Sequence, residues 1–286
     1  MLFLVFSGCA SLPTPKIKEP SELLPNELAT SPIPRIEPGA HTAPIFSIDA
    51  DATGRVLVTG SRDETVRIWA VREGQLLNTL RLPIGVGYWT STVAISPDGT
   101  TVAVGGATGS RWKGFLSWVP DFSIYIFDRV RSRLVRRLSG LPFINDLAFS
   151  RDGRYLAAST RGKNGIGVYR TDNWLLVAED RNYGDDGSSS VDFASDGRLV
   201  STSADGFIRL YGSDFRLLVK QEAPKGKRTF AARFSPEGAR IAVGFDDALA
   251  VDVLDAQDLH LLYAPDIGKT GFFDLSSGVK VAWSQD

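Results

Sequence analysis

The heptapeptide VAISPDG at residues 93–99 has three relatives further along the chain. They are LAFSRDG at 147–153, VDFASDG at 191–197 and ARFSPEG at 232–238. Each is a short apolar run that leads into a polar tetrapeptide ending in glycine. Glycine at that point supplies the positive φ that a tight hairpin turn requires. The chain is therefore built from repeats of one unit.

The unit has a period of a little over forty residues. Its turn glycines are 45, 54, 44 and 41 residues apart by subtraction, and they are Gly54, Gly99, Gly153, Gly197 and Gly238. A second ladder has intervals of 58, 41, 42 and 44, and it consists of Leu76, Leu134, Leu175, Leu217 and Leu261. The segments between these markers are apolar for four to six residues and rich in Val, Ile, Phe and Tyr, which predicts strands. Each unit is thus a four-stranded meander, and the units must stack to bury both faces.

Composition argues against several classes of function. Lys+Arg 32 and Asp+Glu 33 give a net charge of −1, whereas a nucleic-acid-binding domain usually has a basic surplus. With one cysteine, an internal disulfide is excluded. The two histidines, His41 and His260, are far apart, so no Cys/His metal cluster can be written. We predict no nucleic-acid partner, no metal, no cofactor and no catalysis.

The most specific motif lies in the first unit, GAHTAPIFSIDADATGRVLVTGSRDETVRIWA. This unit resembles a WD repeat, the blade of a β-propeller. His41 matches the histidine of the family's Gly-His pair, Asp63 its turn aspartate and Trp69 its tryptophan. Thr59 or Ser61 would supply the hydroxyl of the usual buried network. The resemblance implies that these residues are structural and tie loop to strand.

The resemblance covers about residues 32–286 and predicts an all-β WD-repeat β-propeller with four-stranded blades. Five blades are recognisable, although the later ones lack the histidine, and a sixth is truncated at VKVAWSQD. The outer strand expected at 31–41 would then lack middle strands to pair with, which leaves an open edge. We interpret the sequence as a fragment of a seven-bladed parent. A natural ring of five blades with a ragged end is the alternative.

The N-terminal region predicts two further segments. Residues 1–9 form a leader in which an apolar run precedes Ser7-Gly8-Cys9, and this resembles a bacterial lipoprotein signal with Cys9 as the lipid attachment site. The leader lacks a basic n-region. Residues 10–31 are proline-rich and predict a semi-rigid tether. The chain would be lipid-anchored at the cell envelope, in the periplasm or at the outer membrane. The alternative is a disordered leader on a cytoplasmic protein.

Stretches such as GKNGIGVYR and DFRLLVKQEAPKGKR are similar to propellers of bacterial proteins that also carry a caspase-like peptidase domain. That peptidase keeps its nucleophilic cysteine and partner histidine in its own domain. The likeness therefore implies no protease activity for this chain.

Function is expected on the loops, because packing consumes the blades themselves. The longest insertion, residues 106–122, contains three aromatic anchors for a partner or, alternatively, for a plug over the channel: Trp112, Phe115 and Trp118. Further partner-binding candidates on the same predicted face are Tyr88, Trp89, Phe143, Tyr183 with Asp185 and Asp186, Lys225, Lys227 and Arg228. The arginine run DRVRSRLVRR is interpreted as a solvated edge.

Three classes of function follow from these features. The first is a non-catalytic scaffold that binds a protein or peptide and touches the membrane only through its lipid anchor. The second is a regulatory module of a longer enzyme, such as a caspase-like peptidase. The third, a propeller enzyme, would need a channel lined by histidines, carboxylates or metal ligands, and two isolated histidines argue against it.

Overall fold

The computed structural model describes residues 39–82, 89–107, 110–112, 118–120, 122–224, 228–266 and 278–284. The chain divides into two compact units, Met1–Pro38 and Gly39–Asp286. The predicted leader and tether, with Cys9, lie outside the described residues. All regular structure in the described part of the chain is β-strand. Among the same residues, no helix is long and apolar enough to cross a bilayer.

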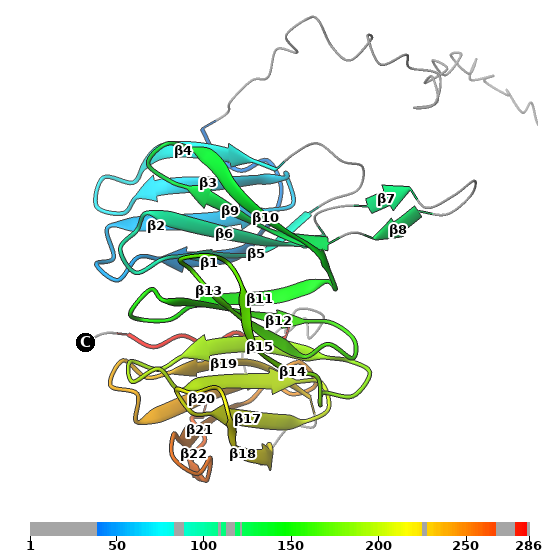
Figure 1. Cartoon of the computed structure of the whole chain (residues 1–286). Helices are drawn as coiled ribbons and strands as arrows, with labels where there is room; N and C mark the ends of the chain where they lie inside the picture. Colours follow the sequence, from blue (N-terminus) through cyan, green and yellow to red (C-terminus); the bar gives the residue numbers. More distant parts are fainter. Residues whose placement is uncertain are drawn as a thin grey trace, which may run out of the picture. The chain divides into compact units, whose positions relative to one another are not determined.

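Five four-stranded antiparallel sheets, blades 1 to 5, succeed one another along the chain (Figure 1). Blade 1 contains β1 (Ile45–Ala50), β2 (Val56–Ser61), β3 (Thr65–Ala70) and β4 (Gln75–Arg81). Blade 2 contains β5 (Trp89–Ile95), β6 (Thr101–Ala107), β9 (Phe122–Asp128) and β10 (Arg133–Leu141). Blade 3 contains β11 (Ile144–Phe149), β12 (Tyr155–Thr160), β13 (Ile166–Arg170) and β14 (Leu176–Asp180). Blade 4 contains β15 (Ser188–Phe193), β16 (Leu199–Ser203), β17 (Phe207–Tyr211) and β18 (Leu217–Glu222). Blade 5 contains β19 (Thr229–Phe234), β20 (Arg240–Phe245), β21 (Val251–Asp255) and β22 (Leu261–Tyr263).

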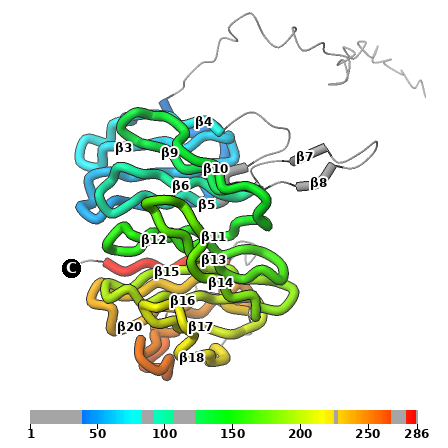
Figure 2. The backbone as a smooth tube through the Cα atoms, viewed as in Figure 1, coloured from blue at the N-terminus to red at the C-terminus, as the bar shows by residue number. Residues whose placement is uncertain are grey.

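Each blade is a meander in which every strand pairs with the next, apart from a two-stranded hairpin inserted into blade 2. The first strands of the blades, β1, β5, β11, β15 and β19, lie next to one another in that order. The blades therefore stack through these inner strands, and Figure 2 shows the succession from blue to orange. The prediction of an all-β propeller with four-stranded blades is confirmed.

The apolar core is divided into clusters, each shared by two consecutive blades. The cluster between blades 1 and 2, for example, contains Val58, Ile68, Val93, Val102 and Tyr125. Similar clusters join blades 2 and 3, blades 3 and 4, and blades 4 and 5. This is why strands with apolar residues on both faces are stable in blades 2 to 4: each of these sheets is covered by a neighbour on both sides.

Blade 1 is exposed on one flank. Ile48 in β1 is 63% exposed, whereas Val93 and Leu147, which occupy the same register position in β5 and β11, are 3% and 4% exposed. Blade 1 thus presents apolar side chains that the equivalent positions of later blades bury. The open edge that the sequence predicts at residues 31–41 lies almost entirely outside the described residues and stays a prediction.

Residues 278–284, which the sequence assigns to the inner strand of a sixth blade, lie between blade 5 and blade 1. The Val279 amide donates to the Phe245 carbonyl at 2.7 Å, and the Lys280 ammonium donates to the Phe46 carbonyl at 2.6 Å. The segment is the red trace near the C label in Figure 1. It connects the first and the last of the five blades.

Candidate functional site

In blade 1, His41 joins the loop before β1 to the middle of the sheet. Its Nδ1 lies 2.8 Å from Asp63 Oδ2, and its Nε2 lies 2.7 Å from Thr59 Oγ1. The Trp69 indole donates to the same hydroxyl oxygen at 2.9 Å. Since an ionised carboxylate only accepts, Nδ1 donates to Asp63, and the Thr59 proton is left for Nε2. All four side chains are thus engaged with one another.

The electrostatics of this network favour an ionised Asp63. Burial opposes ionisation, but hydrogen bonds from Thr65 and His41 outweigh it and hold the pKa of Asp63 below its usual value. Thr65 Oγ1 donates to Asp63 Oδ1 at 2.6 Å, and the Thr42 amide donates to Oδ2 at 3.0 Å. The carboxylate therefore fixes the turn between β2 and β3.

Blade 4 contains a second network at the same place, built from different residues. Ser201 and Tyr211 occupy the register positions of Thr59 and Trp69. Tyr183, in the loop before β15, reaches both: its hydroxyl lies 2.7 Å from that of Tyr211 and also contacts Ser201 Oγ. Tyr183 thus takes the position that His41 has in blade 1.

The Tyr211 hydroxyl extends this network by donating to Asp180 Oδ2 at 2.8 Å. Burial raises the pKa of both tyrosine hydroxyls, so both remain protonated donors at neutral pH. The sequence interpretation placed Tyr183 on an exposed binding face, and this was wrong because its side chain is fully buried. No motif marks Tyr183, although an aromatic residue before an inner strand is a signal that could have been tested.

Arg209 completes the blade 4 network. Its side chain is 1% exposed, and its Nη2 donates to Asp205 Oδ2 at 2.6 Å and to the Asn182 carbonyl at 2.7 Å. The guanidinium carbon lies 4.0 Å from the centre of the Tyr183 ring. Asp205 follows β16 as Asp63 follows β2, so one turn aspartate is held in each of the two blades.

Carboxylates of the inner strands connect consecutive blades. Asp49 in β1 accepts the Ile95 amide of blade 2 at 2.8 Å, and Asp192 in β15 accepts the Phe234 amide of blade 5 at 2.7 Å. Burial raises the pKa of Asp49 to about 6 although two backbone amides act against the shift, and burial also raises the pKa of Asp192. Arg233 lies at the same register position in β19. These carboxylates therefore link one blade to the next by hydrogen bonds.

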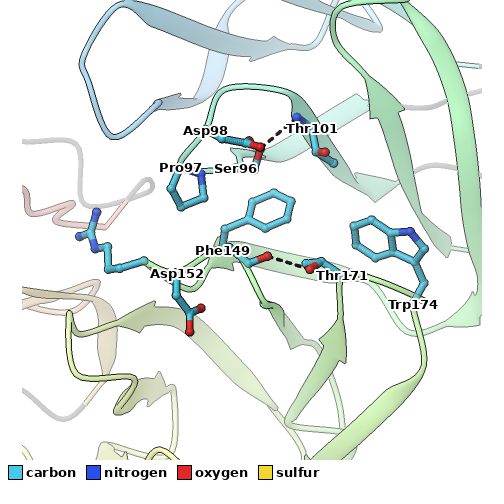
Figure 3. A pocket seen from close by; sticks show the side chains of 10 residues that line it. Ser96, Pro97, Asp98, Thr101, Phe149, Asp152, Thr171 and Trp174 are labelled. Carbon is cyan, nitrogen blue, oxygen red and sulfur yellow. Dashed lines mark hydrogen bonds between the residues drawn. The ribbon is translucent and has the colours of Figure 1, made fainter.

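A cavity of about 300 Å³ lies between blades 2 and 3. One wall is the turn after β5, with Pro97 and Asp98, and the other comes from Phe149, Thr171 and Trp174 of blade 3. Figure 3 shows the rings of Phe149 and Trp174 facing the turn that carries Pro97 and Asp98. In an antiparallel meander this turn lies at the opposite end of blade 2 from the loop between β6 and β9. The cavity is therefore at the other end of the blade from the 106–122 insertion.

The predicted partner-binding residues are only partly described. Tyr88, Phe115, Lys225 and Lys227 lie outside the described residues. For the tryptophan candidates the structure describes the backbone alone: Trp89 begins β5, Trp112 ends β7 (Ser110–Trp112) and Trp118 begins β8 (Trp118–Pro120).

The 106–122 insertion differs from the sequence expectation, which treated it as a loop. The strands β7 and β8 pair as an antiparallel hairpin, with the backbone of Trp112 opposite that of Trp118. The hairpin extends from the end of blade 2 at which the loop between β6 and β9 lies. Arg228, a candidate from another loop, forms an ion pair of 3.2 Å with Asp246.

The arginine run around β10 is largely exposed, as the interpretation of a solvated edge expects. Arg131 pairs with Asp128 at 2.8 Å on the surface of a turn. Arg137 donates to Ser123 Oγ at 3.0 Å and lies over the Tyr125 ring. Arg131 and Arg137 are thus engaged locally.

Among the described residues, Asp255, Asp258 and His260 bring possible metal-ligand atoms within 4.8 Å of one another. They belong to the turn after β21. His260 Nδ1 lies 2.6 Å from Asp258 Oδ1, and the His260 amide donates to the same oxygen at 3.0 Å. These contacts explain the cluster as a capped turn, and we assign no metal to it.

Comparison with known families gives a match to the WD domain, G-beta repeat (WD40), over residues 34–70 and 172–212. The chain carries WD40 repeats. The two matched segments contain the inner three strands of blade 1 and of blade 4, which are the two blades with the His41 and Tyr183 networks. The WD40 matches thus fall on the two blades in which a hydrogen-bond network joins the entering loop to the sheet.

Relatives with WD repeats cover only part of this chain. Eukaryotic translation initiation factor 3 subunit I of Pyricularia oryzae is 37% identical over 60 residues, which are 21% of this chain and 16% of the relative. Ribosome biogenesis protein BOP1 homolog of Monosiga brevicollis is 32% identical over 84 residues, 29% and 10% respectively. WD repeat-containing protein SL1-17 of Schistosoma mansoni is 29% identical over 170 residues, 58% and 49%.

The chain therefore spans between 10% and 49% of the length of these three relatives. All three come from eukaryotes, and the bacterial type expected from the sequence stays a prediction. WD40 repeats indicate a protein-interaction scaffold, which agrees with the first of the three classes of function.

Proposed function

We propose that this WD40 protein is a non-catalytic scaffold that binds a protein or peptide partner at the ends of its blades. The observation that carries the proposal is the use of its chemically capable side chains. His41 and Asp63 bond each other and strand residues, and Asp49 and Asp192 accept backbone amides of the next blade. Groups committed to such bonds hold the scaffold together and leave recognition to the surface.

The insertion in blade 2 is the proposed partner-binding element. It adds the hairpin β7–β8 to one end of the blade, and its sequence contributes Trp112, Phe115 and Trp118. Large aromatic side chains on a surface element are frequent anchors of protein interfaces. The loop that contains Lys225, Lys227 and Arg228 joins blade 4 to blade 5, at the end of the blades that corresponds to the hairpin end of blade 2. Its cations would steer an acidic partner.

The test uses cross-linking mass spectrometry of the full chain with the partner that it retains. Replacing Trp112, Phe115 and Trp118 by serine should leave the melting temperature nearly unchanged and abolish retention of the partner. The matched control replaces Val130, Leu134 and Val135, which are exposed on and beside β10, by serine. Retention that survives in the hairpin variant, or is lost equally in the control, contradicts the assignment of the hairpin.

A regulatory role within a longer enzyme is the second candidate function. Its support is the likeness of GKNGIGVYR and DFRLLVKQEAPKGKR to propellers that accompany a caspase-like peptidase domain. Reading the complete frame of the gene tests it. A peptidase domain in the same frame favours the regulatory module, and its absence favours the independent scaffold.

Lipid anchoring at Cys9 is a separate proposal about location, and its support is the Ser7-Gly8-Cys9 sequence. Expressed in a Gram-negative host with its native upstream region, the wild type should fractionate with membranes and Cys9→Ser should be released. Equal solubility of the two proteins would remove the lipoprotein hypothesis and favour the cytoplasmic alternative.

A further inference from the structure

The cleft between blades 4 and 5 is filled by an arginine of the chain itself. Arg198 follows the turn after β15, and its side chain is 20% exposed. Nε donates to Asp196 Oδ2 at 2.8 Å, Nη2 donates to the Gly238 carbonyl at 2.8 Å and Nη1 donates to the Ala256 carbonyl. The guanidinium carbon lies 5.6 Å from the centre of the Phe234 ring.

The cavity between blades 2 and 3 repeats the wall of blade 5 that receives Arg198. Phe149 ends β11 as Phe234 ends β19. Gly153 ends the following turn, and the Thr171 amide bonds back to that turn as the Ala256 amide does in blade 5. The equivalent groups that line the two clefts are therefore a ring, a turn glycine and the residue after the third strand: Phe149, Gly153 and Thr171 in one, and Phe234, Gly238 and Ala256 in the other.

The opposite wall differs at the position of the arginine. Asp98 stands where blade 4 has Asp196, but the position of Arg198 is occupied by Thr100. The Thr100 hydroxyl bonds to the Asp98 carboxylate at 2.9 Å and is too short to cross to blade 3. A cleft that an arginine fills in one place is thus left as a cavity of about 300 Å³ in the other.

The cleft between blades 3 and 4 shows that this hollow is not a general property of the fold. There Arg154 occupies the position of Arg198, but it pairs with Asp152 of its own turn and is 74% exposed. The Phe215 ring fills the space by packing against Tyr155, with ring centres 4.9 Å apart. Two of these three clefts are therefore filled by the chain, each in a different way.

We propose that the cavity between blades 2 and 3 binds an arginine side chain of a partner peptide. The proposal deepens the scaffold function and rests on it. The incoming guanidinium would take the place that Arg198 has in the equivalent cleft, with donors to the Asp98 carboxylate and to the Gly153 and Thr171 carbonyls. The Gly153 carbonyl already accepts the Thr171 hydroxyl at 2.7 Å, so the guanidinium would use its second lone pair. Its flat face would lie on Phe149.

The chemistry of the site favours arginine over lysine. A guanidinium is planar and presents five donors in a fixed geometry, which suits a carboxylate and two carbonyls on different walls. Trp174 stands where blade 5 has Leu259, and this second aromatic ring adds a surface for cation–π contact. Although burial opposes ionisation, hydrogen bonds from Ser96 and Thr100 hold the pKa of Asp98 below its usual value, so its carboxylate is charged at neutral pH.

Two cations lie at or beside the cavity. Arg151 lines it, and Arg154 is paired with Asp152 at 2.5 Å. The Asp98 carboxylate, which also lines the cavity, forms no ion pair with a cation among the described residues. Asp98 is therefore the carboxylate that an incoming guanidinium would pair with.

The test titrates the full chain with the peptide acetyl-Gly-Arg-Gly-amide and with matched peptides that contain lysine or citrulline. Binding is followed by the NMR signals of Trp174, assigned with Trp174→Phe. We expect the arginine peptide to bind roughly tenfold more tightly than either control, which corresponds to about 1.4 kcal/mol. Citrulline is the sharper control, because it keeps the shape and removes the charge.

Three variants test the comparison of the clefts. Thr100→Arg should fill the cavity from within and weaken peptide binding at least tenfold, whereas Thr100→Ser should bind as the wild type does. Arg198→Thr should open the second cleft and raise the number of bound peptides from one to two. Thermal unfolding of each variant checks that it is folded.

The proposal is overturned if the wild type shows no binding at about 10 mM arginine peptide, a concentration that covers millimolar affinities. It is equally overturned if citrulline binds as well as arginine, or if Thr100→Arg leaves binding unchanged. The hairpin variant distinguishes the two proposed sites. If it no longer retains the partner but still binds the arginine peptide, the cavity and the hairpin interface are separate sites.

Discussion

Blades 1 and 4 solve one structural problem with different side chains. Both must hold the loop that enters the blade against the middle of the sheet. Blade 1 uses His41, with Thr59 and Trp69 as its strand partners. Blade 4 uses Tyr183 with Tyr211, and its buried Arg209 pairs with Asp205. Blade 1 has the buried Arg67 at the equivalent register position. What the two blades share is the position of a polar aromatic ring before the inner strand.

The comparison shows that the network belongs to the architecture of the blade. If the two positions served acid–base chemistry, their side chains would have similar pKa values. Instead, blade 1 has an imidazole and blade 4 has a phenol. The polar atoms in both blades bond to a strand hydroxyl, to an aromatic donor on the third strand or to both. We therefore interpret both networks as structural contacts.

The largest predicted effect on stability concerns Arg209 of the blade 4 network. Arg209→Ala should reduce the free energy of unfolding by about 3–5 kcal/mol, because it leaves the Asp205 carboxylate without its buried partner. Urea denaturation of the variant measures this. The matched control is Arg216→Ala, at an 87% exposed position, which should change stability by less than about 0.5 kcal/mol. Equal effects of the two variants would contradict the role given to Arg209.

A smaller effect compares the aromatic residues on the third strands. Tyr211→Phe removes a buried hydroxyl that bonds both Tyr183 and Asp180, and it should cost about 1–3 kcal/mol. Trp69→Phe removes one indole donor at a half-buried position and should cost only about 1 kcal/mol. Thermal unfolding in the same buffer gives both values. A larger loss in Trp69→Phe would reverse the order of the two blades.

A pH-dependent effect compares Asp49 in β1 with Asp192 at the same register position in β15. Burial raises the pKa of Asp49 to about 6, so the folded state binds a proton more tightly than the unfolded chain does. Stability should then fall as the pH rises from about 4 through 6. Asp49→Asn should flatten this dependence, by roughly 1 kcal/mol after allowance for partial solvent exposure.

Denaturant titrations at several pH values measure the slope, and Asp192→Asn provides the blade 4 counterpart, in which the same direction is expected. An unchanged slope in Asp49→Asn would show that another group is responsible.

Much of the fold could be predicted from local sequence signals. Glycines at the ends of the repeated turns and short apolar runs are enough to place the strands, since both act within a few residues. The His41, Asp63 and Trp69 motif also lies within one unit. These features depend on spacing along the chain, which a sequence displays directly.

The remaining features depend on contacts between units. Tyr183 meets Tyr211 across 28 residues and no motif marks it, so the sequence interpretation missed its burial. At the cavity between blades 2 and 3, Thr100 stands where blade 4 has Arg198. That difference is visible in the sequence, but its meaning requires the position of the neighbouring blade. The 106–122 insertion likewise gave no period-2 signal strong enough to predict the pairing of β7 and β8.

The claim that Tyr183 ties its loop to the sheet of blade 4 is tested most directly by a double-mutant cycle on Tyr183 and Tyr211, whose hydroxyl oxygens are 2.7 Å apart. Unfolding free energies are measured for the wild type, Tyr183→Phe, Tyr211→Phe and the double variant. The account predicts a coupling energy of about 1 kcal/mol, because either single change already removes the shared hydrogen bond. Effects that add within about 0.3–0.5 kcal/mol would contradict it, since residues without contact behave in that way.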